Sequence, residues 1–298
     1  MQDDFASGPI QLRIMQISDL HFGPPLVPAV AEAALASCFR LTPDVLVVSG
    51  DLTQRARREQ FVAARDYLER FPMIPRLVIP GNHDVPLYDI ARRLSDPHRL
   101  YREIISHDLN TVLQVPSETG PGAVLVGLDS TAPRTAISNG RIHSWQLEFC
   151  AHALENAPAD AMRIVVAHHH FAPAPDTLSD ARMPMAQRAI NRFTELGVEL
   201  IMGGHLHRSY IGNSLDFYPG EHRDRGIIIA QSGTTTSRRG RGREKEKNTF
   251  NLIELAAATI KITHYLYFDA EQGFVATSQH YFRRTQRPPA SNEVLLST

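Results

Sequence analysis

The stretch Val45-Leu46-Val47-Val48-Ser49-Gly50-Asp51 passes directly from four apolar residues to a polar turn that ends in a carboxylate. Short continuous runs rich in Val, Ile and Leu predict strands that are buried on both faces. The same pattern, an apolar run that stops abruptly at polar residues, recurs along the chain. The other runs cover residues 14–17, 77–79, 124–128, 164–167 and 200–202. Together these runs predict the central strands of the fold.

Helical periodicity fills the segments between these strands. Apolar residues recur at helical spacing in residues 27–40, 54–70 and 185–196 and after Ser144, and Gly197 provides a stop signal. Alternating strands and helices predict an α/β fold with a largely parallel sheet. After residue 226 the pattern changes, because residues 227–231, 250–255 and 260–268 predict strands without long helices between them. We expect these segments to add strands or a second sheet to the first part of the chain.

Composition and charge narrow the classes of function. The 298 residues are 43% hydrophobic, with 31 Lys and Arg against 32 Asp and Glu. This balance argues against nucleic-acid packaging, and we expect no nucleic-acid polymer as a partner. No apolar run is long enough to cross a bilayer and residues 1–9 lack a secretory pattern, so we expect no membrane insertion and a cytoplasmic location. The only cysteines, Cys38 and Cys150, are predicted to be free thiols.

We expect a single domain over residues 1–298. Residues 10–210 hold the candidate metal motifs, and residues 226–285 supply the C-terminal strands. Residues 286–298 are predicted to form a flexible tail. Nothing in the sequence indicates an oligomeric state.

Polar side chains of metal-binding type follow five of the six predicted strands. In α/β sheets, ligands bind outside the carboxyl ends of the strands. The residues at these ends are Asp19 and His21, Asp51, Asn82 and His83, the run His168-His169-His170, and His205 and His207. They include seven of the 14 histidines in the chain. A lone histidine at a strand end is usually packed or solvated, but clusters at equivalent positions of one fold predict a metal site.

The residue types limit the choice of metal. Carboxylate, imidazole and amide ligands without thiolates suit Mn, Fe, Co or Zn. Asp19 and His21 are two residues apart, as are His205 and His207, and each pair projects to one side if its strand continues. The chain offers more ligands than one ion needs. Two ions bridged by a shared carboxylate are the simplest interpretation.

Taken together, these blocks resemble the calcineurin-like metallophosphoesterases. The motifs that carry the resemblance are Asp19-x-His21, Gly50-Asp51, Gly81-Asn82-His83-Asp84, His168-His169 and Gly204-His205-x-His207. Within the family, the chain looks most similar to bacterial class III cyclic-nucleotide phosphodiesterases. The resemblance implies a four-layer sandwich of two mixed β-sheets flanked by α-helices. It also implies two divalent or trivalent ions of Mn, Fe or Zn.

The resemblance further implies a role for each motif residue. Asp19, His21 and His207 hold one ion, Asn82, His168 and His205 hold the other, and Asp51 bridges the two. His83 protonates the leaving oxygen and is oriented by Asp84, and Asn82, His83 and His207 contact the substrate. A metal-bound hydroxide attacks phosphorus.

The expected reaction is hydrolysis of a small phosphodiester such as a cyclic nucleotide. The alternatives are a phosphomonoesterase, a nucleotide or lipid pyrophosphatase, and a non-enzymatic binding protein of the same fold. Both enzyme alternatives would use the same metal core.

Several assignments stay open at the level of sequence. The ligand in the fourth block is His168, which directly follows the apolar run, or else His169. Residues 171–184 are rich in proline and are interpreted as a loop over the site. Residues 232–248 carry six bases and two acids, and form either a solvated loop or an electropositive rim that attracts an anionic substrate.

Three further residues have two interpretations each. Arg55 meets a phosphate or is an exposed residue at a helix start. Asp129 faces the metal site or forms a turn with Ser130. Tyr210 stacks on a base or packs in the interior.

Overall fold

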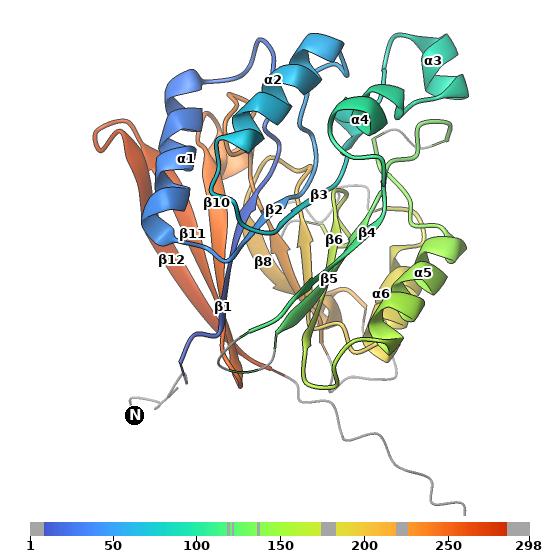
Figure 1. Ribbon diagram of the computed structural model, residues 1–298, viewed down its shortest axis with the longest axis vertical. Helices are drawn as coiled ribbons and strands as arrows, with labels where there is room; N and C mark the ends of the chain where they lie inside the picture. Colours follow the sequence, from blue (N-terminus) through green and yellow to red (C-terminus); the bar gives the residue numbers. More distant parts are fainter. Residues whose placement is uncertain are drawn as a thin grey trace, which may run out of the picture.

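Two mixed β-sheets of six strands each form the centre of the molecule, and helices flank them (Figure 1). The computed structural model describes residues 9–117, 120, 122–135, 138–173, 183–218 and 226–284. The strand order is β12-β11-β10-β1-β2-β3 in the first sheet and β4-β5-β6-β7-β9-β8 in the second. This architecture confirms the predicted sandwich. Most of the expected loop over the site, residues 174–182, and the expected tail, residues 286–298, lie outside the described residues.

The first sheet combines strands from both ends of the chain. β1 (Leu12–Ile17), β2 (Val45–Val48) and β3 (Arg76–Val78) run in parallel. β10 (Thr249–Leu255) pairs antiparallel with β1, and β11 (Thr259–Phe268) and β12 (Gly273–Arg283) extend the sheet with antiparallel pairing. Helices α1 (Pro28–Leu41) and α2 (Arg58–Glu69) connect the parallel strands.

The second sheet has a parallel centre and antiparallel edges. β5 (Ala123–Leu128), β6 (Met162–Ala167), β7 (Leu200–Gly203) and β9 (Ile228–Gln231) are parallel. β4 (Thr111–Val115) and β8 (Tyr210–Asn213) are the antiparallel edge strands. Helices α5 (Ser144–Glu155) and α6 (Ala186–Glu195) connect its strands, and α3 (Ile90–Ser95) and α4 (Arg99–Ile104) precede β4. Three short 3-10 turns cover Asn82–Asp84, Ser214–Asp216 and Gly242–Glu244.

The topology corrects two expectations. The six predicted central strands do not share one sheet, since β1, β2 and β3 lie in the first sheet and β5, β6 and β7 in the second. The C-terminal strands are also divided, because β9 joins the second sheet while β10 and β11 complete the first. The elements β4, β8, β12, α3 and α4 were not predicted. An apolar run shows which segment is buried, but it does not show which distant strand lies beside it.

The four predicted helices are present with slightly different ends. α2 begins at Arg58 rather than near residue 54, because Arg57 still has an extended backbone. The predicted stop after α6 is confirmed, since Gly197 has a φ of 70°. Its N–H and that of the next residue bond back to carbonyls of the last helical turn. This pairing is a Schellman motif, in which glycine adopts the left-handed conformation without steric cost.

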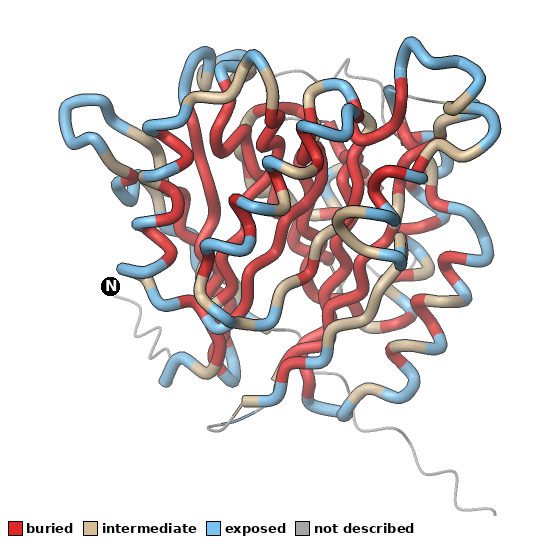
Figure 2. The backbone as a smooth tube through the Cα atoms, turned by 45° about the horizontal axis from the view of Figure 1, so that its top comes forward, coloured by how far each residue is buried: buried red, intermediate tan, exposed pale blue. Residues whose placement is uncertain are grey.

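Three hydrophobic clusters fill the layers of the sandwich. Successive residues of a central strand face opposite layers: Leu46 and Val48 of β2 belong to the cluster that includes α1 and α2, whereas Val45 and Val47 pack between the sheets. A third cluster joins the second sheet to α5 and α6. Figure 2 shows the buried strands at the centre and the exposed outer faces of the helices. Burial of the strands on both faces confirms the prediction from their continuous apolar sequence.

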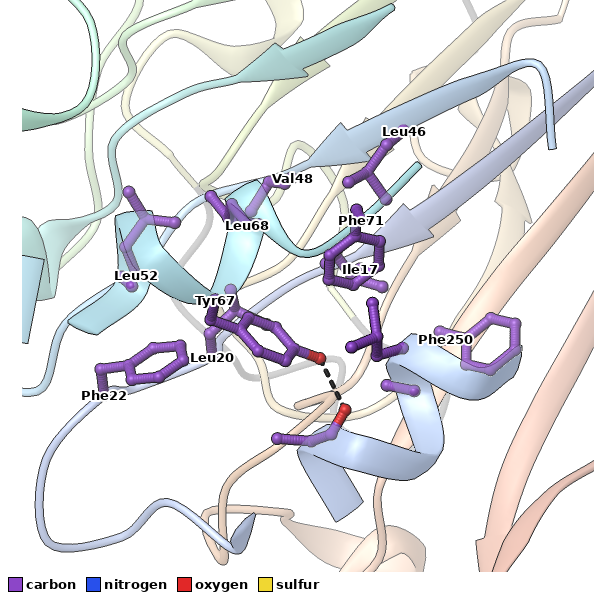
Figure 3. Packing of buried hydrophobic residues seen from close by; sticks show 14 of the residues in the cluster. Ile17, Leu20, Phe22, Leu46, Val48, Leu52, Tyr67, Leu68, Phe71 and Phe250 are labelled. Carbon is purple, nitrogen blue, oxygen red and sulfur yellow. Dashed lines mark hydrogen bonds between the residues drawn. The ribbon is translucent and has the colours of Figure 1, made fainter. Parts of the chain in front are cut away.

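Figure 3 shows the cluster beneath α1 and α2. The Tyr67 ring of α2 packs against Phe22 and Phe71, with centroids 5.4 and 5.2 Å away. Its hydroxyl donates to the carbonyl of Ala31 in α1 at 2.8 Å. This bond satisfies a buried polar group and ties the two helices together. Cys38 and Cys150 are buried and free, as predicted.

Candidate metal centre

The predicted ligands lie in loops at the carboxyl ends of β1, β2, β3, β6 and β7. The first three strands belong to one sheet and the last two to the other, so the site lies where the two sheets present the same end. The side chains of Asp19, His21, Asp51 and His168 are almost completely buried, as is that of His207. The tertiary structure therefore brings together residues that are up to 188 positions apart, from Asp19 to His207.

One group of ligand atoms surrounds Asp19. Its Oδ1 atom lies 3.2 Å from Nε2 of His207 and 3.7 Å from Nε2 of His21. The two Nε2 atoms are 3.2 Å apart, and Nε2 of His21 is 3.6 Å from Oδ2 of Asp51. The donor atoms of these four buried residues all lie within 4.8 Å of one another. Such convergence of carboxylate and imidazole atoms matches a cation site.

A second group surrounds the amide oxygen of Asn82. This Oδ1 atom lies 2.9 Å from Nδ1 of His205 and 3.2 Å from Nε2 of His168. The same Nε2 atom of His168 is 3.4 Å from Oδ1 of Asp51. Asp51 therefore turns one oxygen toward each group. A carboxylate that bridges two ions would occupy such a position.

Buried carboxylate oxygens without a hydrogen-bond donor indicate whether the two groups of ligand atoms could bind cations. Oδ1 of Asp19 and Oδ2 of Asp51 are buried and accept no hydrogen bond among the described residues. A buried carboxylate without a donor is costly unless a positive charge compensates it. Both oxygens face the first group of ligand atoms. The donor set and these two oxygens fit bound divalent ions.

Backbone conformation sets the directions of the ligands. Asp19, His21, Asp51, His205 and His207 all have positive φ angles, between 49° and 74°. This left-handed region is uncommon for residues other than glycine, and its occupation often marks a functional site. The sequence-based argument assumed that the strands continue through the D-x-H and H-x-H pairs. That assumption is wrong, because β1 ends at Ile17 and β7 at Gly203, and left-handed residues then turn both side chains inward.

Two motif glycines are required by close contact. Gly50 has a φ of 99°, and a Cβ atom there would lie 2.5 Å from Nδ1 of His168. A Cβ atom on Gly204 would lie 2.0 Å from Oγ of Ser18 and 2.5 Å from Oδ2 of Asp19. Both distances are far below normal contact. The glycines therefore allow the ligand loops of the two sheets to approach each other.

A buried polar layer holds the Asp19 loop from behind. Ser18 Oγ donates to Oδ2 of Asp19 at 2.7 Å, and Thr234 Oγ1 donates to the Asp19 carbonyl at 2.7 Å. Thr236 Oγ1 donates to the carbonyl of Leu20 at 2.7 Å. Residues 232–237 are fully buried, so the solvated-loop interpretation is wrong for this part of residues 232–248. The run of short hydroxyl side chains was the feature of the sequence that could have predicted this burial. The neighbouring arginines suggested instead that the whole segment is exposed.

His83 contacts groups that the sequence did not predict. Its Nδ1 atom lies 2.9 Å from the carbonyl oxygen of Gln54, and its Nε2 atom lies 3.0 Å from Nη1 of Arg239. The same guanidinium donates to Oε1 of Gln54 at 3.1 Å, and the Arg239 carbonyl lies 2.9 Å from Nδ1 of His207. Arg239 therefore joins the site from the basic segment. Sequence reasoning placed it only in a general electropositive rim.

The predicted contact between Asp84 and His83 is absent from the described part of the chain. The Asp84 carboxylate instead accepts backbone N–H groups from Leu52, Thr53 and Gly81 at 2.8 to 3.0 Å. These donors flank Asp51 and Asn82. Asp84 is thus turned toward the backbone, because three neighbouring buried N–H groups need an acceptor. It fixes the relative position of two ligand loops.

The histidine run divides its three rings among different surroundings. His168 donates from Nδ1 to the carbonyl of Ser49 (2.8 Å) and turns Nε2 to the second ligand group. His169 Nδ1 lies 2.8 Å from Oγ of Ser130, and the His170 ring stacks on His205 at 5.6 Å. This geometry favours His168 over His169 as the ligand.

Charges within the site shift several pKa values. Burial raises the pKa of Asp19, but His207 and His21 lower it overall, to about 2. Burial likewise opposes ionisation of Asp51, yet His168 and His83 hold its pKa well below the usual range. Burial lowers the pKa of His168, whereas Asp51 raises it to about 9. The two carboxylates therefore stay ionised at neutral pH and are ready to bind cations.

The structure also shows the surroundings of the three residues that had two interpretations each. Oδ1 of Asp129 accepts from the backbone and hydroxyl of Thr131, which is turn chemistry. Tyr210 is buried and donates to the carbonyl of Ala172 at 2.5 Å, so it packs in the interior. The Arg55 guanidinium lies over the ring of Tyr88, 5.2 Å from its centroid.

Comparison with known proteins agrees with this geometry. A family model described as calcineurin-like phosphoesterase matches residues 12–209, which include every predicted ligand. The chain belongs to the calcineurin-like phosphoesterase family. The family and the buried ligand groups together indicate a metal-dependent phosphoester hydrolase with a dinuclear site.

Two curated relatives share moderate sequence identity with the chain. A probable cyclic nucleotide phosphodiesterase of Synechococcus sp. is 27% identical over 233 residues, 71% of this chain and 79% of the relative. A transmembrane protein with a metallophosphoesterase domain from Danio rerio is 25% identical over 196 residues. That match covers 66% of this chain and only 40% of the zebrafish protein. No helix in the described residues of this chain has the length and apolar character to span a membrane.

Solved structures show the same fold. A purple acid phosphatase from yellow lupin superposes with a TM-score of 0.67 at 12% identity, covering 93% of this chain and 54% of the lupin protein. A dimetal phosphatase from Danio rerio gives a TM-score of 0.63 at 12% identity, covering 93% of this chain and all of the fish protein. At this identity the likeness concerns the fold alone.

Proposed function

We propose that this chain is a dinuclear metal-dependent phosphodiesterase that hydrolyses a small phosphodiester. The observation that carries the proposal is the position of Asp51, whose two oxygens face two separate ligand groups. Asp19, His21 and His207 would hold one ion, and Asn82, His168 and His205 the other. Bound there, two ions of Mn, Fe or Zn would polarise the phosphoryl oxygens and activate water.

The residues around His83 prepare the site for an anionic substrate. Nδ1 of His83 donates to the Gln54 carbonyl, so Nε2 is the acceptor that faces Arg239. Burial lowers the pKa of His83, which favours the neutral ring. A phosphoryl oxygen would draw the Arg239 guanidinium away from this nitrogen. Nε2 of His83 would then face the leaving oxygen, and once this atom has taken up a proton from solvent, the imidazolium would be placed to give that proton to the leaving oxygen.

Cyclic nucleotides are the first substrate class to test, and nucleotide or lipid pyrophosphates are the second. The named relative from Synechococcus supports the first class. In a substrate of either class, one phosphorus atom would react at the same metal core. We also propose a cytoplasmic location.

The test is hydrolysis of bis-(p-nitrophenyl) phosphate with added Mn²⁺. We expect wild-type turnover, and a loss of at least about 100-fold in kcat for Asp51→Ala and Asn82→Ala, because each removes a ligand. Asp66→Ala changes an exposed carboxylate on α2 and serves as the control. Full activity of either ligand variant would refute the two-metal assignment. Absence of metal by elemental analysis, together with no turnover, would instead favour a binding protein.

A further inference from the structure

A basic pocket lies beside the proposed metal centre. It is a cavity of about 460 Å³ at the start of α2, and residues 86–89 and the start of α4 form its other walls. Its lining includes Arg55, Arg57, Arg92, Arg99 and Tyr88. A cavity of this volume accommodates a small ligand. None of these residues is among the proposed metal ligands.

Some arginines of the pocket are already paired. Arg57 lies 3.9 Å from Glu59, and Arg92 lies 3.6 Å from Asp89. Among the described residues, no carboxylate lies within 4.0 Å of the guanidinium groups of Arg55 and Arg99, although the charge of Arg99 also acts on Glu103. Arg58, also in the lining, pairs with Glu103. The pocket therefore carries uncompensated positive charge, which an anionic ligand would neutralise.

Arg55 is held in a defined position. Its backbone N–H donates to Oε1 of Gln60 at 2.8 Å. Its guanidinium lies 5.2 Å from the centroid of the Tyr88 ring, a cation–π contact, and Tyr88 itself is 75% exposed. The Arg55 side chain is itself exposed, and the contact with the ring leaves its guanidinium N–H groups available for bidentate contact with a phosphate.

Gln54, the residue before Arg55 of the pocket lining, contacts residues of the proposed metal centre. The carbonyl of Gln54, which forms the peptide bond to Arg55, lies 2.9 Å from Nδ1 of His83. The Gln54 side chain accepts from Arg239 at 3.1 Å. Arg55 therefore belongs to the pocket and directly follows a residue that contacts both His83 and Arg239.

We propose that the pocket binds a second phosphate group of the substrate, one that is not hydrolysed at the metal centre. This inference rests on the proposed phosphodiesterase function and chooses between its two substrate classes. A cyclic nucleotide has a single phosphate, which the metal core engages. The unpaired arginines instead favour a diester that carries another phosphate, such as a nucleotide or lipid pyrophosphate.

Two substrate pairs test this. The first pair is thymidine 5′-(p-nitrophenyl phosphate) with and without a 3′-phosphate, and the second is a nucleoside diphosphate ester against cyclic AMP. We expect wild type to prefer the two-phosphate member of at least one pair by about tenfold in kcat/KM. Arg55→Gln and Arg99→Gln should each reduce that preference at least about fivefold, mainly through KM. Arg65→Gln, an exposed arginine paired with Asp66 on α2, should keep it.

The outcomes separate this inference from the proposed function. If wild type hydrolyses the p-nitrophenyl esters but shows no preference in either pair, the second-phosphate site is refuted and the phosphodiesterase stands. A preference that both pocket variants retain refutes the site as well. If wild type hydrolyses no ester with Mn²⁺, the proposed function fails and this inference fails with it.

Discussion

The structure gives Asp84 a role that can be separated experimentally from the role expected from sequence. The carboxylate accepts three buried backbone N–H groups, from Thr53 at Oδ1 and from Leu52 and Gly81 at Oδ2. Asp84→Ala leaves all three donors without a partner. Each buried unsatisfied donor costs about 1–3 kcal/mol, so the free energy of unfolding should fall by at least about 3 kcal/mol.

Asp84→Asn is the milder and more informative change. Its amide oxygen can replace Oδ2 and keep two of the bonds, while its NH₂ group faces the N–H of Thr53 at the Oδ1 position. One donor is then left unsatisfied, and we expect a loss of about 1–3 kcal/mol. Asp66→Asn, on the exposed face of α2, should change the free energy of unfolding by less than about 0.5 kcal/mol.

Urea unfolding in EDTA near pH 4 is the appropriate assay for these losses, because metal binding then does not contribute and ionisation of Asp84 does not yet destabilise the wild type. It also gives a pH signature. Burial and the charge of Asp51 raise the pKa of Asp84 to about 7, against an ordinary value of 3.8. The folded chain therefore binds this proton more tightly than the unfolded chain, so this group's contribution to stability decreases as pH rises from about 4 to 7. The stability of Asp84→Asn should therefore lack this dependence on pH.

The reasoning is refuted if, near pH 4, Asp84→Asn unfolds at the same urea concentration as wild type. Should the same variant lose kcat and show an altered pH profile of activity, the sequence-based role of orienting His83 would be supported instead.

Three further predictions concern the ligand loops. His168→Ala should lose about one of two bound metal equivalents by elemental analysis, whereas His169→Ala should retain both; equal losses would contradict the assignment of His168. Gly204→Ala should abolish metal binding or soluble expression, because its Cβ atom would lie 2.0 Å from Oγ of Ser18; normal metal content would show that the loops can separate. Metal binding at pH 7.5 should release about one proton, because the pKa of His168 is raised to about 9 in the metal-free chain and the ligand must be neutral. Affinity should therefore weaken as pH falls, and calorimetry in buffers of different ionisation enthalpy measures the released proton.

The sequence predicted those parts of the fold that depend on the local pattern of apolar residues and stop signals. The continuous run Val45–Val48 and its counterparts correctly identified buried strands, and the stop at Gly197 was correctly placed. The division of these strands between two sheets was not predictable, because strands such as β1 and β10 pair across more than 200 residues. Edge strand β12, whose residues are mostly exposed, has no apolar run to reveal it.

The candidate site likewise divides into features that the sequence predicted and features that only the structure revealed. The sequence by itself determined which residue types gather at strand ends, and hence that carboxylates and histidines such as Asp51 and His168 form a metal site. Only the tertiary structure decided how each side chain is used. Left-handed backbone turns aim the ligands, Asp84 binds backbone rather than His83, and Arg239 enters the site from a distant basic segment. The physical reason is that residue type limits the possible chemistry, whereas direction and partner depend on φ angles and on which buried N–H groups need an acceptor.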